Sequence, residues 1–192
     1  MNNFTGLFIA LCWAAFFVYM VISAFSVKRT VEVVRGWTWS WLILAIVVGA
    51  LLLFKYFVHL RVYVTDMVLW PRTLITDVIA GILVLSGLGI ALWGRIALGR
   101  NWNMYPALKE NHELIERGPY AYVRHPMYSG LLLMFLGTVI WYATVAGIAI
   151  FVASLLGTWF KLRQEEKLLT KHFGECYLNY KARVKALIPF VL

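Results

Sequence analysis

The sequence predicts an all-α integral membrane protein with about five transmembrane helices. Of its 192 residues, 62% are hydrophobic and only 14% are charged, and the mean hydropathy is +0.76. Such values are typical of membrane proteins rather than of soluble domains. A helix needs roughly 20 mostly apolar residues to cross the hydrocarbon layer, and several stretches of the chain approach or exceed that length.

Three of the expected spans lie in the N-terminal half. Phe4 to Val27 contains no charged residue, and no Lys or Arg precedes it, which argues against a cleaved signal peptide. Trp37 to Phe54 begins with tryptophans, which are common at the membrane–water interface. The third span is expected from about Leu74 to Gly94, with Asp77 near one end.

The fourth and fifth spans are expected to form a short helical hairpin. From Pro126 to Phe160 the chain has 35 consecutive uncharged residues. One straight helix of that length would extend about 52 Å at 1.5 Å per residue, whereas the hydrocarbon layer is only ~30 Å thick. The chain must therefore turn back, and the small and β-branched residues of "WYATVAG" (Trp141 to Gly147) mark the turn.

The basic residues predict the orientation, because short loops rich in Lys and Arg stay on the cytoplasmic side. Of the 18 Lys and Arg residues, 15 lie after the first span, between the third and fourth spans, or after the fifth span. Only Lys55, Arg61 and Arg72 lie elsewhere. We therefore expect the N-terminus outside and the C-terminus in the cytoplasm. The net charge of +9 is attributed mainly to this topology and to anionic lipid headgroups.

Other kinds of site and partner are not indicated. The basic residues are spread over membrane loops rather than over one soluble face, so a nucleic-acid partner is not expected. Cys12 and Cys176 fall in different parts of the topology, so neither a disulfide nor a metal–thiolate site is expected. Without internal repeats or a linker, residues 1–192 are interpreted as one membrane domain, and the oligomeric state is left open.

The polar residues gather in two segments, residues 99–125 and residues 161–185. A hairpin between them returns the chain to the depth at which it started, so His125 and Lys161 are expected to lie at the same level. Pro126 suits the first turn of the fourth helix and favours an extended His125. The two segments should therefore face each other and form one candidate site on the cytoplasmic side.

The fifth helix is expected to continue beyond the membrane to about His172, with Gly174 as its C-terminal cap. Glu165 and Glu166 would then stand about one turn above the membrane, opposite Arg124 and His125. A further helix follows, in which Tyr177 and Tyr180 share one face because they are three residues apart.

Each of these features also has an ordinary explanation. His125 could be an interfacial histidine, Arg124 a lipid anchor, and the tyrosines at 120, 122 and 128 members of an aromatic belt. Gly87, Gly89, Gly94 and Gly99 could either pack helices closely or leave a groove for a ligand. The convergence of the polar residues, rather than any one of them, favours a site.

Four sequence stretches resemble the isoprenylcysteine carboxyl methyltransferase family, part of a wider group of membrane methyltransferases that includes phospholipid N-methyltransferases. They are "LGRNW" (98–102), "HELIERGPYAYVRHPMYSG" (112–130), "RQEEKLLTKHFGECYLNYKARV" (163–184) and the closing "IP" (188–189). The resemblance covers the C-terminal half of the chain, so residues 98–192 are expected to form the catalytic half and residues 1–97 the first three spans.

The resemblance implies an S-adenosyl-L-methionine-dependent methyltransferase that releases S-adenosyl-L-homocysteine and binds its cofactor at the cytoplasmic face. The cofactor residues that it implies are His112, Glu113, Leu114, Ile115, Tyr120, His125, Pro126, Met127, Tyr128 and Glu165, with Glu166 beside the last. The catalytic or charge-positioning residues that it implies are Arg124, His125, Lys161, Arg163 and Glu165.

One position departs from the family pattern. The eukaryotic enzymes have an arginine four residues before the glutamate to bind the substrate carboxylate, and this chain has Lys161 there. A lysine is a point charge and cannot bind a carboxylate through two parallel hydrogen bonds. The expected reaction is carboxyl O-methylation of an isoprenylcysteine-type acceptor entering from the bilayer, but the substitution weakens a strict specificity.

Three alternatives remain. The acceptor could be a phospholipid amine, or a thiol, in which case His125 or Glu165 would take the proton. The arginine–histidine–proline segment also resembles membrane sterol reductases, which bind NADPH but are usually much longer. A scaffold without enzymatic activity is disfavoured by the clustering of the polar groups.

Overall fold

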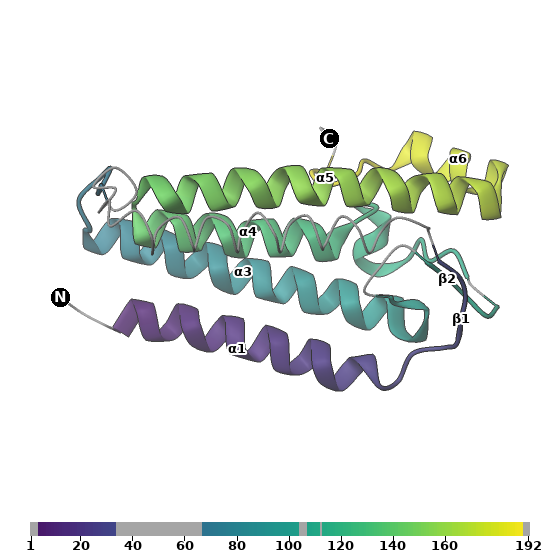
Figure 1. Ribbon diagram of the computed structural model, residues 1–192, viewed down its shortest axis with the longest axis horizontal. Helices are drawn as coiled ribbons and strands as arrows, with labels where there is room; N and C mark the ends of the chain where they lie inside the picture. Colours follow the sequence, from purple (N-terminus) through teal and green to yellow (C-terminus); the bar gives the residue numbers. More distant parts are fainter. Residues whose placement is uncertain (1–3, 34–66, 104–106, 112, 190–192) are drawn as a thin grey trace, which may run out of the picture.

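The computed structural model describes residues 4–33, 67–103, 107–111 and 113–189, and four long helices lie side by side in it (Figure 1). They are α1 (Phe4–Ala24), α3 (Leu74–Leu98), α4 (Pro126–Tyr142) and α5 (Val145–Phe173). Three of them, α1, α3 and α5, are long and apolar enough to cross a membrane, and α4 is a shorter apolar helix. The protein is therefore an integral membrane protein, as predicted; the expected span from Trp37 to Phe54 lies outside the described residues.

The hairpin between α4 and α5 confirms that the long apolar run folds back. α4 ends at Tyr142, because the next residue, Ala143, has a left-handed φ of 55° that stops the helix. The side chain of Thr144 then caps α5 by accepting a hydrogen bond from the backbone N–H of Gly147 at 3.2 Å. α5 runs without interruption for 29 residues, whereas α4 has 17. Of the two helices of the expected short hairpin, only α4 is therefore short. α5 ends at Phe173 and is followed by Gly174 (φ 55°), the cap expected from the sequence.

Glycines bring α3 and α4 into close contact. A Cβ added to Gly87 would lie 2.6 Å from the carbonyl oxygen of Gly130, and one added to Gly94 would lie 2.9 Å from Met127 Cγ. By contrast, a Cβ on Gly89 would meet nothing within 4 Å. Gly87 and Gly94 therefore serve helix packing rather than a ligand groove, which decides between the two explanations considered for them.

Alanine at Gly130 is expected to destabilise the protein by about 1–3 kcal/mol, the usual cost of overpacking. Its Cβ would meet backbone atoms of Gly87 and Ala91, which cannot move aside as a flexible side chain can. Gly89→Ala is the matched control on α3 and is expected to leave stability unchanged or slightly raised, since alanine favours helix. Melting temperatures in detergent compare the two; equal shifts would contradict this view of the α3–α4 contact.

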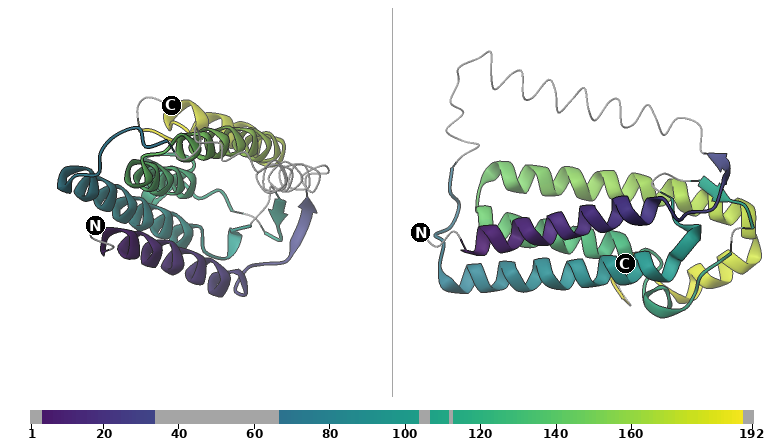
Figure 2. Two further views of the ribbon diagram at one scale, coloured as in Figure 1. Left: turned by 60° about the vertical axis from the view of Figure 1, so that its left-hand side comes forward. Right: turned by 90° about the horizontal axis from the view of Figure 1, so that it is seen from below.

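The short elements collect at one end of the bundle (Figure 2). They are the 3-10 helices η1 (Gly99–Asn101) and η2 (Gly118–Ala121), strands β1 (Thr30–Val33) and β2 (Ala107–Lys109), and α6 (Glu175–Arg183). β1 and β2 pair antiparallel, with Glu32 opposite Leu108 and an irregularity between Thr30 and Glu32. The all-α prediction describes the bundle correctly but misses this small sheet.

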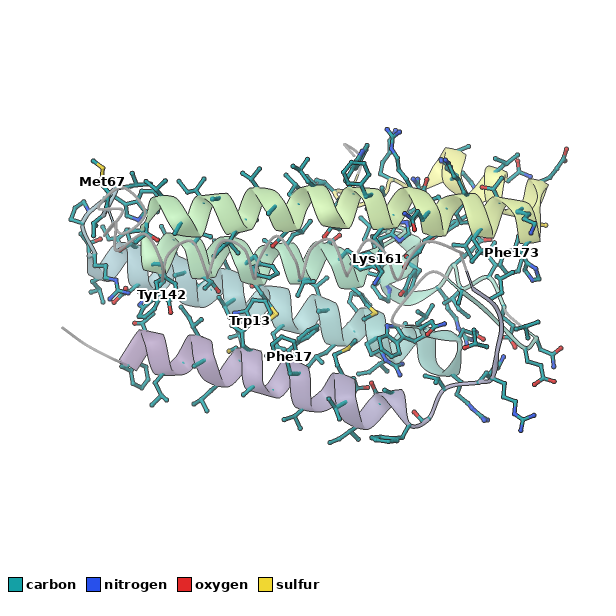
Figure 3. All side chains as sticks on the ribbon, in the orientation of Figure 1. Trp13, Phe17, Met67, Tyr142, Lys161 and Phe173 are labelled. Atoms are coloured by element: carbon teal, nitrogen blue, oxygen red, sulfur yellow. The ribbon has the colours of Figure 1, made fainter. Side chains whose placement is uncertain are left out.

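The two ends of the bundle differ in charge. Figure 3 places Lys161 and Phe173 toward one end and Met67 and Tyr142 at the other. Among the described Lys and Arg residues, only Arg72 lies at the Tyr142 end, where its Nε donates to the carbonyl oxygen of Trp141 at 2.9 Å. The polar segments of the sequence thus meet at a single end of the molecule.

Candidate active site

The corner before α4 is held by the C-terminal tail. Pro126 occupies the first position of α4, and His125 precedes it with φ −131° and ψ 60°. This ψ lies outside the extended range, so the expected extended conformation of His125 is wrong, although the residue does stay outside the helix. The backbone N–H groups of Arg124 and His125 donate to the carbonyl oxygens of Lys185 (2.8 Å) and Ala186 (3.0 Å). These two hydrogen bonds tie the corner to the tail. They therefore fix the backbone positions from which the Arg124 and His125 side chains extend.

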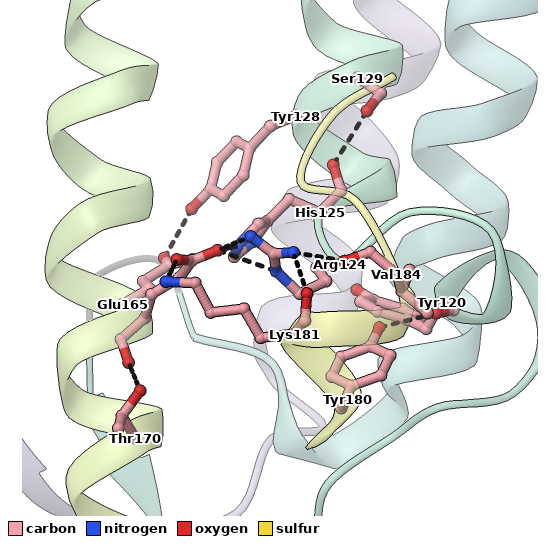
Figure 4. A network of polar contacts seen from close by, with 11 residues as sticks. Tyr120, Arg124, His125, Tyr128, Ser129, Glu165, Thr170, Tyr180, Lys181 and Val184 are labelled. Atoms are coloured by element: carbon pink, nitrogen blue, oxygen red, sulfur yellow. Dashed lines mark hydrogen bonds and ion pairs between the residues drawn. The ribbon is translucent and has the colours of Figure 1, made fainter. Parts of the chain in front are cut away.

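Two adjacent glutamates of α5, Glu165 and Glu166, have different partners; Figure 4 labels Glu165 beside Tyr128. Glu165 accepts a hydrogen bond from the Tyr128 hydroxyl at 2.6 Å. Glu166 accepts from Arg124 Nε at 2.9 Å and from Lys181 Nζ at 2.6 Å. Successive residues of a helix point about 100° apart, so one carboxylate faces α4 and the other faces the Arg124 side.

His125 lies between the two carboxylates without a hydrogen bond to either. Its Nδ1 is 3.7 Å from Glu165 and its Nε2 is 3.5 Å from Glu166, beyond the usual hydrogen-bond range. The side chain is 7% exposed, and its buried Nε2 has no hydrogen-bond partner among the described residues. A buried ring nitrogen left in this way is a candidate group for binding a ligand.

Arg124 also holds α6 and the tail in place. Its guanidinium donates to the carbonyl oxygens of Lys181, at 3.3 Å, and of Val184. The side chain is only 8% exposed. Through these contacts and its pair with Glu166, Arg124 links α5 to α6 and to the tail.

Buried tyrosines complete the contact between α6 and η2. The Tyr180 hydroxyl donates to the carbonyl oxygen of Tyr120 at 2.6 Å. Burial raises the pKa of Tyr120, Tyr177 and Tyr180 above the ordinary value for a phenol. These hydroxyls therefore stay protonated at neutral pH. That of Tyr180 donates to Tyr120, whereas the buried Tyr177 hydroxyl has no hydrogen-bond partner among the described residues. The predicted shared face of Tyr177 and Tyr180 is confirmed, since both side chains are buried.

A cavity of about 230 Å³ lies beside this network. Seven of the sequence-predicted site residues line it: Tyr120, Arg124, His125, Met127, Tyr128, Lys161 and Glu165. Lys161 and Glu165 are four residues apart and so share one face of α5. The Lys161 ammonium lies 5.0 Å from the centre of the Tyr128 ring. A carboxylate, an ammonium group and aromatic faces are thus combined in one partly open cavity.

The remaining predicted residues lie elsewhere. Glu113 is exposed and pairs with Lys28 at 3.8 Å, and Leu114 and Ile115, beside it, are not among the residues that line the cavity. Pro126 is buried against Gly94 of α3. Arg163 and Glu166 border a second, larger hollow on the other side of Arg124. His112 is outside the described residues.

Several lining residues were not identified from the sequence. Asn101 and Trp102 lie in the "LGRNW" stretch, to which no role was assigned, although the buried Asn101 Oδ1 has no partner among the described residues. Phe16 and Met20 of α1 also line the cavity, and a span that is apolar throughout gives no signal for this. Lys181, the second partner of Glu166, was likewise missed.

Arg95 positions the Trp102 wall of the cavity. It is 2% exposed and donates to the carbonyl oxygens of Ser23 and Gly99, both at 2.7 Å. Its guanidinium lies 4.7 Å from the centre of the Trp102 ring. One buried cation thus joins the ends of α1 and α3 and supports an aromatic face of the cavity.

These features define a helical membrane protein with a partly open cavity, lined by polar and apolar side chains, at one end of its bundle. The chain belongs to the phospholipid methyltransferase family, which it matches over residues 75–176, just over half of its length. The resemblance to isoprenylcysteine carboxyl methyltransferases is confirmed by the relatives that follow.

Protein-S-isoprenylcysteine O-methyltransferase B of Arabidopsis thaliana is 35% identical over 85 residues, covering 43% of this chain and 43% of the relative. Methanethiol S-methyltransferase of Crocosphaera subtropica is 40% identical over 72 residues, covering 38% of this chain and 28% of the relative. The chain spans less than half the length of the curated relatives it matches.

A solved structure of the eukaryotic intramembrane Ras methyltransferase ICMT (isoprenylcysteine carboxyl methyltransferase) is also similar. It aligns with a TM-score of 0.55 and 21% sequence identity, over 82% of this chain and 54% of that chain. At this identity the match is evidence for a shared fold. It agrees with the helical membrane architecture described above.

Proposed function

We propose that this chain is a membrane methyltransferase that uses S-adenosyl-L-methionine and acts on a lipid-like or prenylated small acceptor. One observation is central to this proposal: Tyr128 of α4 and Glu165 of α5 meet at 2.6 Å inside a cavity that His125 and Lys161 also line. The family match and the relatives, all of them methyltransferases by name, support the same reaction class.

The donor groups of the cavity suit this cofactor. S-adenosyl-L-methionine supplies a methyl group activated on a sulfonium cation. Glu165 would bind its ammonium or ribose hydroxyl groups, Lys161 its carboxylate, and the faces of Tyr128 and Trp102 favour a nearby cation. The cavity volume of about 230 Å³ is smaller than the roughly 300–1,000 Å³ of typical ligand pockets. Residues 104–106, which connect the lining residues Asn103 and Ala107, lie outside the described part of the chain.

The contribution of the chain to the reaction is mainly alignment and exclusion of water, because methyl transfer is an in-line displacement. A carboxylate acceptor needs no general base. An amine or thiol acceptor would lose a proton, and the imidazole of His125 and the carboxylate of Glu165 are the groups able to take it. Arg124, already bound to Glu166, would hold the His125 corner in position rather than touch the acceptor.

Carboxyl O-methylation of an isoprenylcysteine-type acceptor is the preferred reaction, because the relatives named isoprenylcysteine O-methyltransferases are the most numerous of those compared. Methylation of a phospholipid amine is the second candidate. The family match and the lysine at position 161 favour it, since a lysine binds a carboxylate less specifically than an arginine does. The excess of Lys and Arg at the cavity end supports a cytoplasmic site and C-terminus.

Calorimetry on the detergent-solubilised protein tests the reaction class. We expect S-adenosylhomocysteine to bind and NADPH to give no heat of binding. Incubation with methyl-labelled cofactor and either a prenylcysteine analogue or extracted phospholipids then identifies the acceptor. Binding of NADPH without binding of S-adenosylhomocysteine would refute the proposal in favour of a reductase.

A further inference from the structure

A second hollow lies outside the candidate active site, beyond the Arg124–Glu166 pair. It has a volume of about 660 Å³ and is bordered by the C-terminal half of α5, by Lys181 of α6 and by Ala186 of the tail. Figure 4 shows Lys181 beside Arg124 on this side of α5. We call this hollow the α5–α6 groove.

The α5–α6 groove is strongly cationic. Arg163, Lys167 and Lys171 follow one another at intervals of four residues on α5 and are exposed, as is Lys181. Glu166 is the only carboxylate among the described residues that border the groove, and it is already bound by Arg124 and Lys181. With Glu166 already bound, the exposed Arg163 and Lys167 alone give the groove an excess of positive charge, so the groove attracts an anion.

The position of the groove on α5 indicates what kind of anion. Closer to the N-terminus of α5, the same side of the helix exposes apolar side chains: Ile148, Val152 and Leu155 are 39%, 46% and 40% exposed. Trp159 marks the boundary, and the Arg163 guanidinium lies 4.9 Å from the centre of its ring. Tryptophan is common at the level of lipid headgroups, so the groove lies where an apolar surface gives way to a cationic one.

We propose that the α5–α6 groove binds the headgroup phosphate of an anionic phospholipid whose acyl chains lie along Ile148, Val152 and Leu155. A soluble anion would satisfy the cations but would leave the adjoining apolar surface unused. A zwitterionic lipid would match the apolar surface, but its own positive group would oppose the cations. This inference does not depend on methyl transfer, so it can fail while the proposed function holds, and the reverse is also true.

Native mass spectrometry on the purified, detergent-solubilised chain tests the groove. The probes are phosphatidylglycerol, phosphatidylcholine with the same acyl chains, and soluble glycerol phosphate. We expect phosphatidylglycerol to bind more tightly than the other two. In the double variant Lys167→Gln/Lys171→Gln the preference should fall by on the order of 10- to 30-fold, since each basic residue near an anionic surface accounts for about a fivefold change in affinity.

The matched control is Arg29→Gln/Arg100→Gln, which removes the same charge from exposed cations at the same end of the bundle but outside the groove. It should keep the preference for phosphatidylglycerol. An equal loss in both double variants would indicate general attraction to the membrane and would overturn the proposal. So would equal binding of both lipids, or binding of glycerol phosphate as tightly as phosphatidylglycerol. Melting temperatures of both variants confirm that they are folded.

Discussion

Replacing Arg124 with leucine is expected to lower the free energy of unfolding by about 3 kcal/mol. Breaking a buried ion pair costs roughly 3–5 kcal/mol because the partner charge remains buried. Here the side chains of Arg124 and Glu166 are 8% and 13% exposed. The lower end of the range applies because Lys181 still contacts Glu166 after the substitution. Thermal unfolding in detergent, followed by circular dichroism, measures the loss.

Arg183→Leu is the control for this substitution. Arg183 also pairs with a glutamate, Glu116, at 2.9 Å, but the two side chains are 67% and 37% exposed. An exposed pair contributes about 0–1 kcal/mol, so little change is expected. The double variant Arg124→Leu/Glu166→Leu should recover part of the stability, since it removes both buried charges. A destabilisation no larger than that of Arg183→Leu would contradict the anchoring role of Arg124.

Glu165→Gln is expected to weaken binding of S-adenosylhomocysteine by roughly 10- to 100-fold. Hydrogen bonds to a charged group contribute about 1.5–3 kcal/mol, and the substitution removes the charge while preserving the size of the side chain. The amide oxygen can still accept from the Tyr128 hydroxyl, so the contact between α4 and α5 is expected to remain. Calorimetry gives the affinity, and a melting temperature close to that of the unaltered protein would show an intact fold.

Glu175→Gln provides the matched control for Glu165→Gln. Glu175 begins α6 and is exposed, and it borders neither the cavity nor the α5–α6 groove. Its substitution should leave the affinity for S-adenosylhomocysteine within about twofold, well inside the effect of losing one hydrogen bond. An equal effect of the two substitutions would remove Glu165 from the proposed cofactor site.

Much of the backbone arrangement can be predicted from local properties of the sequence. The run of uncharged residues from Pro126 to Phe160 is too long for one span, and the observed turn at Ala143 and Thr144 falls inside the predicted stretch. Pro126 and Gly174 mark the start of α4 and the end of α5 because each has a backbone preference that acts locally. These predictions need no knowledge of tertiary contacts.

The rotation of each helix could not be predicted in the same way. The spans are apolar on all sides, so no face is marked as the one that points inward. Phe16 and Met20 of α1 border the cavity because α1 packs on α3 and because Arg95 links the ends of these two helices. The β1–β2 pair was missed because its strands have only four and three residues, too few for a clear alternating pattern, and lie far apart in the sequence.

The sequence by itself determined that the chain is a membrane protein, that its last apolar run doubles back and that two polar segments meet at one end, because hydropathy and chain length impose these features. The resemblance had singled out Glu165, but only the tertiary structure showed where each carboxylate points: Glu165 faces the cavity, whereas Glu166 is bound by Arg124 and Lys181. The two residues are neighbours of the same type, and their side chains point about 100° apart around the helix. Their different contacts therefore depend on how α5 is oriented, which its contacts with α4, α6 and the tail determine.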